Sequence, residues 1–276
     1  MISINNLAFS YGSNQVLKNI TMTLEPGRIY GLLGENGVGK TTLLTLLSGL
    51  KKTQEGTIDA DGRNPYGRQP SLLADQYYLP DEVAPVHSKA CAWAKSAGRF
   101  WPNFSLDRFL EIMKVFENDP EQMMSAMSNG QLKKTYISFA LACGPRYLYM
   151  DEPTNGLDIP SKAQFRSAIM KYTADDSTIV ISTHQVRDLE NVIDPIIILD
   201  KRDVLLNATV EEIADKLFFD YGTTLNPDSL YTEQLPGGFI QVYQNSGKQD
   251  SKVNIEALFN AVHKNKELIK GIFSNE

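Results

Sequence analysis

The sequence is poor in the features that define several common protein classes. Its 276 residues include two cysteines, Cys91 and Cys143, which lie far apart and form no CxxC pair. This argues against a disulfide scaffold and favours a reducing compartment. Basic residues are not in excess, since 27 lysines and arginines face 33 acidic residues and give a net charge of -6. We therefore expect no nucleic-acid partner held by bulk charge, although a local basic groove is compatible with this total.

Long apolar runs are also missing. The most apolar stretches, such as PIIIL at 195–199, are far shorter than the ~20 residues that span a bilayer. The N-terminal segment MISINNLAFSYG alternates polar and apolar residues like a strand and does not resemble a secretion signal. If the protein acts at a membrane, we expect another chain to supply the spans. The content of 42% hydrophobic and 22% charged residues is typical of a globular protein.

The remaining pattern predicts an α/β protein. Residues 1–33 read as strands broken by turns, and an apolar helix is expected from Leu43 to Leu50. Residues 86–143 have several helical patterns, among them LKKTYISFALAC. The aromatic residues of that region are expected to fill its own core, while an exposed patch for a partner is the rarer alternative.

Strands and helices alternate again after Gly144-Pro145. RYLYM, STIVIST and PIIIL read as strands, helices are expected at 161–172 and 186–192, and a further strand at DVLLN. Near-continuous apolar runs of this kind are typical of a parallel sheet covered on both faces. Beyond about Asp215, a hairpin-like GGFIQVYQN and a helix-like NIEALFNAVHKNKELIKGIF predict a small appendage packed on the core.

The segment GENGVGKT at 34–41 matches G-x-x-x-x-G-K-[ST], the phosphate-binding loop. Its glycines allow a tight turn whose N–H groups point inward at an anion, and the following helix adds its positive end. Lys40 is expected to neutralise the phosphates, and Thr41 to offer its hydroxyl to Mg²⁺. A chance glycine-rich turn is disfavoured by the apolar strand before the loop and the apolar helix after it. The motif alone specifies neither the nucleotide nor hydrolysis.

Two further strands end in polar side chains. YLYM runs into Asp151 and Glu152, and a later strand ends at His184. In a parallel sheet the carboxyl ends of the strands gather at the ligand, so these groups are expected beside the phosphate loop. One acid can hold Mg²⁺ and the next can act as general base. An ordinary strand terminus would explain the acids alone, but not their combination with the loop.

The order of these motifs resembles the ATP-binding cassette (ABC) ATPases, in particular the separate ATPase subunits of ABC transporters. The diagnostic segment, MSNGQ at 127–131, looks like the family's signature and precedes the strand that ends in the acids. The resemblance covers roughly residues 1–212. It implies a P-loop NTPase core with a parallel sheet and an N-terminal antiparallel β subdomain at 1–85 and 144–212. An α-helical subdomain is implied at 86–143 and a small C-terminal extension at 213–276.

The same resemblance implies roles for individual residues. Tyr11 would stack on adenine, although an ordinary strand aromatic is an equal alternative without the family. The nucleotide and its Mg²⁺ would be held by Gly34, Glu35, Asn36, Gly37, Val38, Gly39, Lys40, Thr41 and Thr42, with Asp151 as a further metal ligand. Glu152 would be the catalytic base and His184 the switch histidine that contacts the γ-phosphate. Asp158 would belong to the loop that communicates across a dimer.

The signature residues Ser128, Asn129, Gly130 and Gln131 are expected to act on another subunit. Ser128 can cap the following helix, so that the N–H groups of Asn129 and Gly130 face outward. By the resemblance they close over the ATP that a second subunit holds, in a homodimer or heterodimer with two ATPs. A plain N-cap is the structural alternative for Ser128.

Two positions depart from the family pattern. Asn129 stands where the signature has glycine, which is a mild change because asparagine tolerates unusual backbone angles. Asp81 stands where the family has a glutamine that touches Mg²⁺ and the attacking water. An acid can still bind Mg²⁺ or orient water, so the change concerns hydrolysis and coupling rather than nucleotide binding.

We therefore expect an ATP-hydrolysing subunit that drives transport through separately encoded permease subunits, on the cytoplasmic face of the membrane. The appendage and Asp81 favour export. A soluble ABC ATPase of ribosomes or DNA is less favoured, because the chain has one cassette and no heptad run between its motifs. A nucleotide-sensing subunit remains the third reading, and a GTPase is disfavoured because no NKxD motif occurs.

Overall fold

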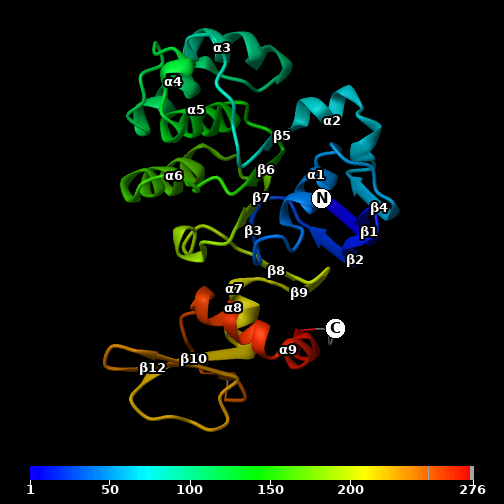
Figure 1. Cartoon of the computed structure of the whole chain (residues 1–276), viewed down its shortest axis with the longest axis vertical. Coiled ribbons are helices and arrows are strands. Elements are labelled where there is room, and N and C mark those ends of the chain that lie inside the picture. Colours follow the sequence, from blue (N-terminus) through cyan, green and yellow to red (C-terminus); the bar gives the residue numbers. More distant parts are fainter. Residues whose placement is uncertain (248, 274–276) are drawn as a thin grey trace.

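A six-stranded sheet forms the centre of the protein in the computed structural model, which describes residues 1–247 and 249–273 (Figure 1). Its strands, in spatial order, are β5 (Gln76–Leu79), β6 (Tyr147–Asp151), β7 (Thr178–Thr183), β3 (Arg28–Leu33), β8 (Ile196–Asp200) and β9 (Asp203–Ala208). The first five pair in parallel and β9 returns antiparallel to β8. The carboxyl ends of the parallel strands therefore lie along one edge.

Both faces of this sheet are buried, which explains the near-continuous apolar runs of its strands. In β6, Tyr147 and Tyr149 point into one hydrophobic core, whereas Leu148 and Met150 point into the other. All four side chains are at most 2% exposed. Successive side chains of a strand alternate between faces, so one sequence run supplies both cores.

The first core lies under helix α1 (Lys40–Leu47) and a three-stranded antiparallel sheet. That sheet has the order β2-β1-β4 and consists of β1 (Ile2–Tyr11), β2 (Asn14–Leu24) and β4 (Glu55–Ala60). A 3-10 turn, η1 (Pro65–Gly67), and helix α2 (Pro70–Asp75) then lead into β5. The parallel sheet and the antiparallel β part expected from the sequence are both present.

The second core lies under a helical layer. Its elements are α3 (Ala90–Ala97), η2 (Gly98–Phe100), α4 (Leu106–Val115), η3 (Met124–Ala126), α5 (Asn129–Ala142) and α6 (Ile159–Tyr172). Aromatic rings pack around Phe139, with Trp93 at 4.5 Å between ring centroids and Phe104 at 5.5 Å. Phe100 is the exception, because it is 76% exposed. Among the described residues, no helix has the length and apolar character needed to cross a membrane.

The remaining chain forms a C-terminal unit below β8 and β9 (Figure 1). It contains α7 (Val210–Lys216), β10 (Leu217–Gly222), β11 (Tyr231–Leu235), β12 (Gly238–Gln244), α8 (Ile255–Lys264) and α9 (Lys266–Phe273). Its three strands form an antiparallel sheet in the order β10-β12-β11. Lys266 and Lys270 of α9 form ion pairs with Asp200 and Asp203, which flank the β8–β9 turn. The unit thus contacts the core through this turn, through the Arg187–Glu256 ion pair, and through its own buried apolar residues, which belong to the second core.

The prediction of a helix at 186–192 is wrong. The structure has a single 3-10 turn, η4 (Val186–Asp188), followed by another turn in which the Val192 N–H donates to the Leu189 carbonyl at 2.8 Å. The Asp188 carbonyl, which a continuing helix would use, accepts a bond from the Arg166 guanidinium at 3.0 Å. Tertiary contacts with α6 therefore replace the helical ladder here.

The single helix expected near the C-terminus is divided into α8 and α9. Asn265 lies between them with φ -128° and ψ 47°. Its side-chain amide donates to the Leu230 carbonyl at 2.6 Å and to the Ala261 carbonyl at 3.2 Å. Because asparagine competes with the backbone for hydrogen bonds, it favours a break at this position.

We predict that Lys266→Met lowers the free energy of unfolding by about 1–3 kcal/mol, because it leaves a buried carboxylate without its ammonium partner. Asp200 is 3% exposed, whereas Asp203 is 49% exposed. Lys270→Met is therefore the matched control, with an expected change of about 0–1 kcal/mol. Urea unfolding followed by circular dichroism measures both. An equal or larger effect of Lys270→Met would contradict this account.

Candidate functional site

The glycine-rich segment 34–41 forms the turn between β3 and α1. Gly37 and Gly39 have φ values of 84° and 113°, which a residue with a side chain adopts only with strain. A Cβ at Gly39 would also lie 2.8 Å from the Val16 side chain. The turn therefore depends on glycine for both its angles and its close packing, and it ends at the N-terminus of α1, where N–H groups are free to bind an anion.

Lys40 is buried at the start of α1, with 6% of its surface exposed. Its ammonium donates to the carbonyls of Gly34 at 2.7 Å and Glu35 at 3.2 Å, and it lies 3.5 Å from the Glu152 carboxylate. The lysine is thus folded back over its own loop and reaches the acid at the end of β6. A phosphate bound in the loop would lie within the same group of charges.

Asp151 ends β6 and is 2% exposed. The Ser182 hydroxyl on the neighbouring strand β7 donates to it at 2.5 Å, and the Tyr78 hydroxyl donates at 3.5 Å. Burial, together with the nearby Asp151 carboxylate, raises the pKa of Tyr78, so its hydroxyl stays protonated as a donor. The Asp151 carboxylate is therefore fixed by hydrogen bonds from two strands.

Glu152 follows with φ 45°, an unusual backbone angle for a residue with a side chain. Its N–H donates to Ser182, and its carboxylate accepts from the His184 N–H at 3.3 Å. The Nδ1 atom of His184 lies 2.9 Å from Glu152 Oε1. The strained turn thus places the carboxylate between Lys40 and His184. Backbone strain of this kind is concentrated at functional sites.

Lys40, Asp151 and Glu152 meet in a cavity of 390 Å³ at the carboxyl edge of the sheet, whereas His184 contacts Glu152 without lining this cavity. Its wall includes Asn36, Gly37, Gly39, Lys40, Thr41, Thr42, Tyr11, Asp81, Asp151 and Glu152. Thr41 is exposed in the first turn of α1. The Tyr11 hydroxyl lies 3.3 Å from the Thr42 hydroxyl, and half of its side chain is exposed at the rim. The structure therefore groups the loop, the acids and Asp81 around one space.

The signature residues lie elsewhere. Ser128 caps α5 by accepting from the Gln131 N–H at 3.3 Å, while the Gln131 side chain accepts from the Ser128 N–H at 2.9 Å. This capping box leaves the helix start at the surface. Asn129 lines a different cavity, of 410 Å³, together with Asn155 and Gly156. Within the described residues, none of 128–131 lines the cavity of the phosphate loop.

Asp158 also lies outside that cavity and caps α6. Its carboxylate accepts from the Ser161 N–H at 2.9 Å, and hydrogen bonds from Ser161 lower the pKa of Asp158. The residue is therefore ionised at neutral pH at the exposed end of the loop 153–158.

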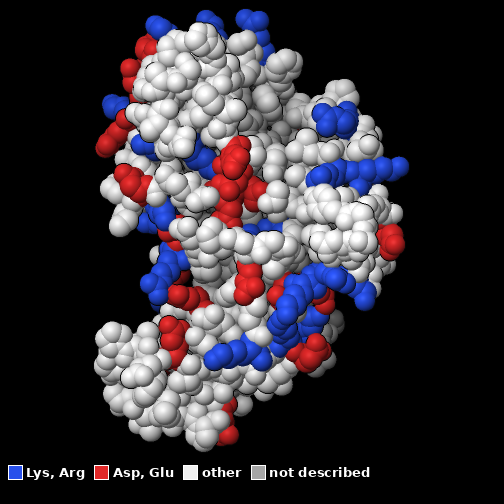
Figure 2. Space-filling view, viewed as in Figure 1, with Lys and Arg blue, Asp and Glu red and all other residues white. Residues whose placement is uncertain are grey.

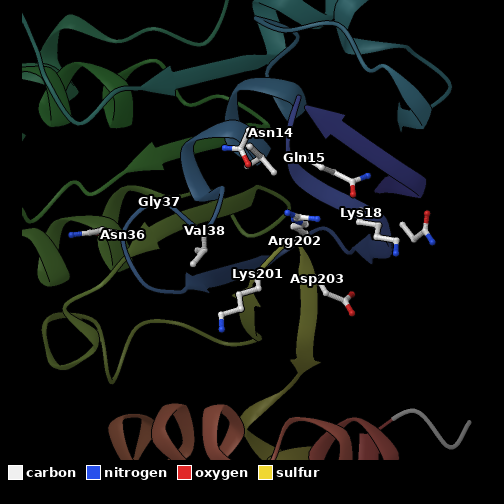
Figure 3. A pocket seen from close by; sticks show the side chains of 11 residues that line it. Asn14, Gln15, Lys18, Asn36, Gly37, Val38, Lys201, Arg202 and Asp203 are labelled. Carbon is white, nitrogen blue, oxygen red and sulfur yellow. The ribbon is translucent and has the colours of Figure 1, made fainter. Parts of the chain in front are cut away.

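A larger hollow of 760 Å³ adjoins the phosphate loop on the side of the β8–β9 turn (Figure 3). It shares Asn14, Val16, Asn36 and Gly37 with the first cavity. Lys18, Lys201 and Arg202 give its wall a positive charge. Figure 2 shows basic side chains near β9 and acidic ones between the helical layer and the rest of the core. Positive charge beside the loop favours an anionic ligand.

Sequence reasoning missed four residues of this region: Ser182, Tyr78, Lys133 and Asn155. Ser182 has the clearest signal, because it is the penultimate residue of β7, whose register pairs it with Asp151. The sequence shows the strand end but not which strand is its neighbour. Lys133 and Asn155 both contact Asp81 from distant segments, and no local pattern marks such contacts.

A glycine loop at a helix start, with two acids at the end of another parallel strand of the same sheet, defines a phosphate-loop nucleotide-binding protein. A sequence model described as "ABC transporter" matches residues 17–155, about half of the chain. The chain belongs to this family of ATP-binding ATPases. The fold class and the family expected from the sequence are therefore confirmed.

Curated relatives agree with this assignment. The ABC transporter ATP-binding protein YtrB of Bacillus subtilis is 28% identical over 78% of this chain and 74% of its own length. MJ1023, an uncharacterised ABC transporter ATP-binding protein of Methanocaldococcus jannaschii, is 28% identical over 84% of this chain and 88% of its own. The lantibiotic transport ATP-binding protein SrtF of Streptococcus pyogenes is 29% identical over 70% of this chain and 84% of its own.

Solved structures share the fold. The ATP-binding subunit of an ABC transporter superposes with a TM-score of 0.69 at 23% identity, covering 77% of this chain and 91% of that chain. A dimeric post-hydrolysis cassette, MJ0796 with ADP and Pi, gives a TM-score of 0.66 at 21% identity, covering 76% and 98%. Because identities of 23% and 21% are low, the similarity to the solved structures establishes the cassette fold alone.

We predict that Lys40→Met weakens ATP binding about 100-fold or more, because at least two charge-assisted bonds of ~1.5–3 kcal/mol each are lost. Lys52→Met, an exposed lysine outside both cavities, is the control and should bind like the wild type. Isothermal titration calorimetry measures the affinities. Equal affinities for the two variants would show that the loop lysine does not contact the nucleotide.

Proposed function

We propose that the protein is the ATPase subunit of an export-type ABC transporter and that two subunits close head-to-tail around two Mg²⁺-ATP. The observation that carries this proposal is the separation of the signature from the phosphate loop. Within one subunit the start of α5 faces outward and lines no part of the nucleotide cavity. The N-terminus of a helix is an anion site, so Ser128, Asn129 and Gly130 would complete the site of a second subunit.

The residues of the cavity fit a magnesium ion. Mg²⁺ prefers oxygen ligands, and it usually binds one or two carboxylates together with phosphate oxygens and water. Thr41, Asp151 and Asp81 supply a hydroxyl and two carboxylates on the wall of one cavity. No group of three or more His, Cys, Asp and Glu residues that could hold a metal occurs in the described part of the chain. A bound Mg²⁺ would neutralise phosphate charge during transfer.

The chain's own groups suit hydrolysis. Lys40 would release the Gly34 and Glu35 carbonyls and bind the phosphates instead. Glu152 would orient a water and accept its proton, held in place by His184 and by its own strained turn. His184, 34% exposed on its side chain, would reach the terminal phosphate. Tyr11 at the rim would stack on the base.

Membrane subunits have a suitable docking surface. A groove of 650 Å³ between α2, β5 and η2 is lined by Leu50, Leu73, Tyr77, Phe100 and Trp101. Phe100 is 76% exposed there, and Leu50 52%. Exposed apolar surface of this kind is typical of interaction sites. We infer that a permease subunit binds this groove and holds the ATPase at the cytoplasmic face of the membrane. Export is favoured by relatives named for lantibiotic transport and linearmycin resistance.

Dimerisation gives the direct test. Glu152→Gln should keep ATP bound without turnover, so the mass in solution should double from 30.8 kDa when ATP and Mg²⁺ are added. Multi-angle light scattering after gel filtration measures this. Glu152→Gln with Ser128→Arg is the matched control, because it should bind ATP in its own cavity and stay monomeric. A monomeric Glu152→Gln protein with ATP bound would refute the closed dimer.

Partner binding can be tested separately at the groove. Phe100→Asp should abolish co-purification of a polytopic membrane protein from native membranes, because it places a charge in an apolar contact. ATP affinity should be unchanged. Leu225→Asp, at a residue 57% exposed on the C-terminal unit, is the control and should keep the partner. Loss of the partner in both variants, or in neither, would refute docking at this groove.

A further inference from the structure

Asp81 joins three segments that are far apart in the sequence. It lies just after β5, and its carboxylate is 3.4 Å from the ammonium of Lys133 on α5. The Asn155 side-chain amide, from the loop after β6, donates to the same carboxylate at 3.2 Å and 3.4 Å. The residue at the position of the family's glutamine is thus held by the signature helix and by the loop that leads to Asp158.

Lys133 is buried for a lysine, with 4% of its surface exposed. An ammonium has three protons to donate. In the structure its acceptors are the carbonyls of Pro80 and Asp81 and the carboxylate of Asp81. All three belong to the two residues that follow β5. Because an unpaired buried charge is costly, the segment 80–81 and Lys133 stabilise each other.

Asp81 also borders two cavities. It lines the nucleotide cavity with Lys40, Asp151 and Glu152, and it lines the second cavity with Asn129 and Lys133. Its side chain is 40% exposed. A carboxylate on a flexible loop would sample many positions. A carboxylate that is bonded to a buried ammonium is instead held in one position at the wall of the nucleotide cavity.

We propose that Lys133 is a positioning residue that holds Asp81 at the nucleotide cavity, so that Mg²⁺-dependent binding of ATP depends on the signature helix of the same subunit. This inference rests on the proposed function, because it presumes that Asp81 faces a Mg²⁺-nucleotide. Its alternative is that Lys133 only anchors the backbone of residues 80–81. Backbone anchoring would affect folding but would leave the Mg²⁺ dependence of ATP binding unchanged.

The test compares ATP binding over a range of Mg²⁺ concentrations in the full-length Glu152→Gln protein, in which turnover does not interfere. Lys133→Met and Asp81→Asn are made singly and together in this parent. Lys134→Met is the matched control, because this neighbouring lysine donates to the Phe116 carbonyl at 2.9 Å and does not contact Asp81. A fluorescent ATP analogue reports binding, with one series in EDTA.

In EDTA the affinity of Lys133→Met should stay within about twofold of the parent, since Lys133 does not line the nucleotide cavity. Its half-saturating Mg²⁺ concentration should rise about tenfold or more, as is typical when a group that orients a metal ligand is lost. Asp81→Asn should give the same rise. The half-saturating Mg²⁺ concentration of the double variant should be no higher than that of Asp81→Asn, because Lys133 then has no carboxylate to position.

Two results would overturn the inference while leaving the proposed function intact. In one, Lys133→Met needs no more Mg²⁺ than Lys134→Met. In the other, the two single effects multiply in the double variant, which would mean that Lys133 acts independently of Asp81. A parent that binds no ATP would instead overturn the proposed function. If Lys133→Met does not fold, Lys133→Gln takes its place, because it removes the charge and keeps a donor.

Discussion

The site depends on the parallel register of strands β3, β7 and β6. Leu33 at the end of β3 lies beside Thr183, and Ser182 lies beside Asp151 at the end of β6. This alignment brings the start of the phosphate loop, the histidine turn and the acids to one edge, although they are up to 150 residues apart in the sequence. A parallel strand that slipped by one residue would turn each terminal side chain to the opposite face. The two buried cores make that slip costly, since Tyr149 and Met150 would exchange environments.

The same edge explains why strain is tolerated at Glu152. Glu152, with its positive φ, comes directly after β6, a strand that is hydrogen-bonded to a neighbour on each side. Ser182 binds both the Asp151 carboxylate and the Glu152 N–H, so one hydroxyl fixes two consecutive residues on either side of the bend. A rigid strand and a buried serine thus hold a backbone conformation that an exposed loop would relax.

Local chemistry made much of this predictable from sequence. The glycine loop and the paired acids are continuous in the sequence, and the central strands stand out as apolar runs. The α/β class and the closeness of the loop to the acids therefore follow from short segments. Contacts between segments that are far apart in the sequence could not be predicted in this way. The helix expected at 186–192 is absent because Arg166 takes the Asp188 carbonyl, and Lys133 contacts Asp81 across 52 residues. The roles assigned to individual residues, among them Tyr11, Glu152, His184, the signature residues and Asp158, remain predictions.

The charges around the cavity give a physical reason for the cation in the proposed function. Asp81, Asp151 and Glu152 line it together with Lys40, and the ammonium of Lys133 lies within electrostatic reach of all three acids. Burial lowers the pKa of Lys133, and these carboxylates oppose that shift, with Asp81 the strongest. Three carboxylates therefore face two ammonium groups before any ligand is bound. A nucleoside triphosphate would add several more negative charges to this space, which the N–H groups of the glycine loop and the end of α1 offset in part. On the proposed function, a divalent cation bound with the nucleotide would close that deficit, and Mg²⁺ and ATP would then be interdependent ligands of the site.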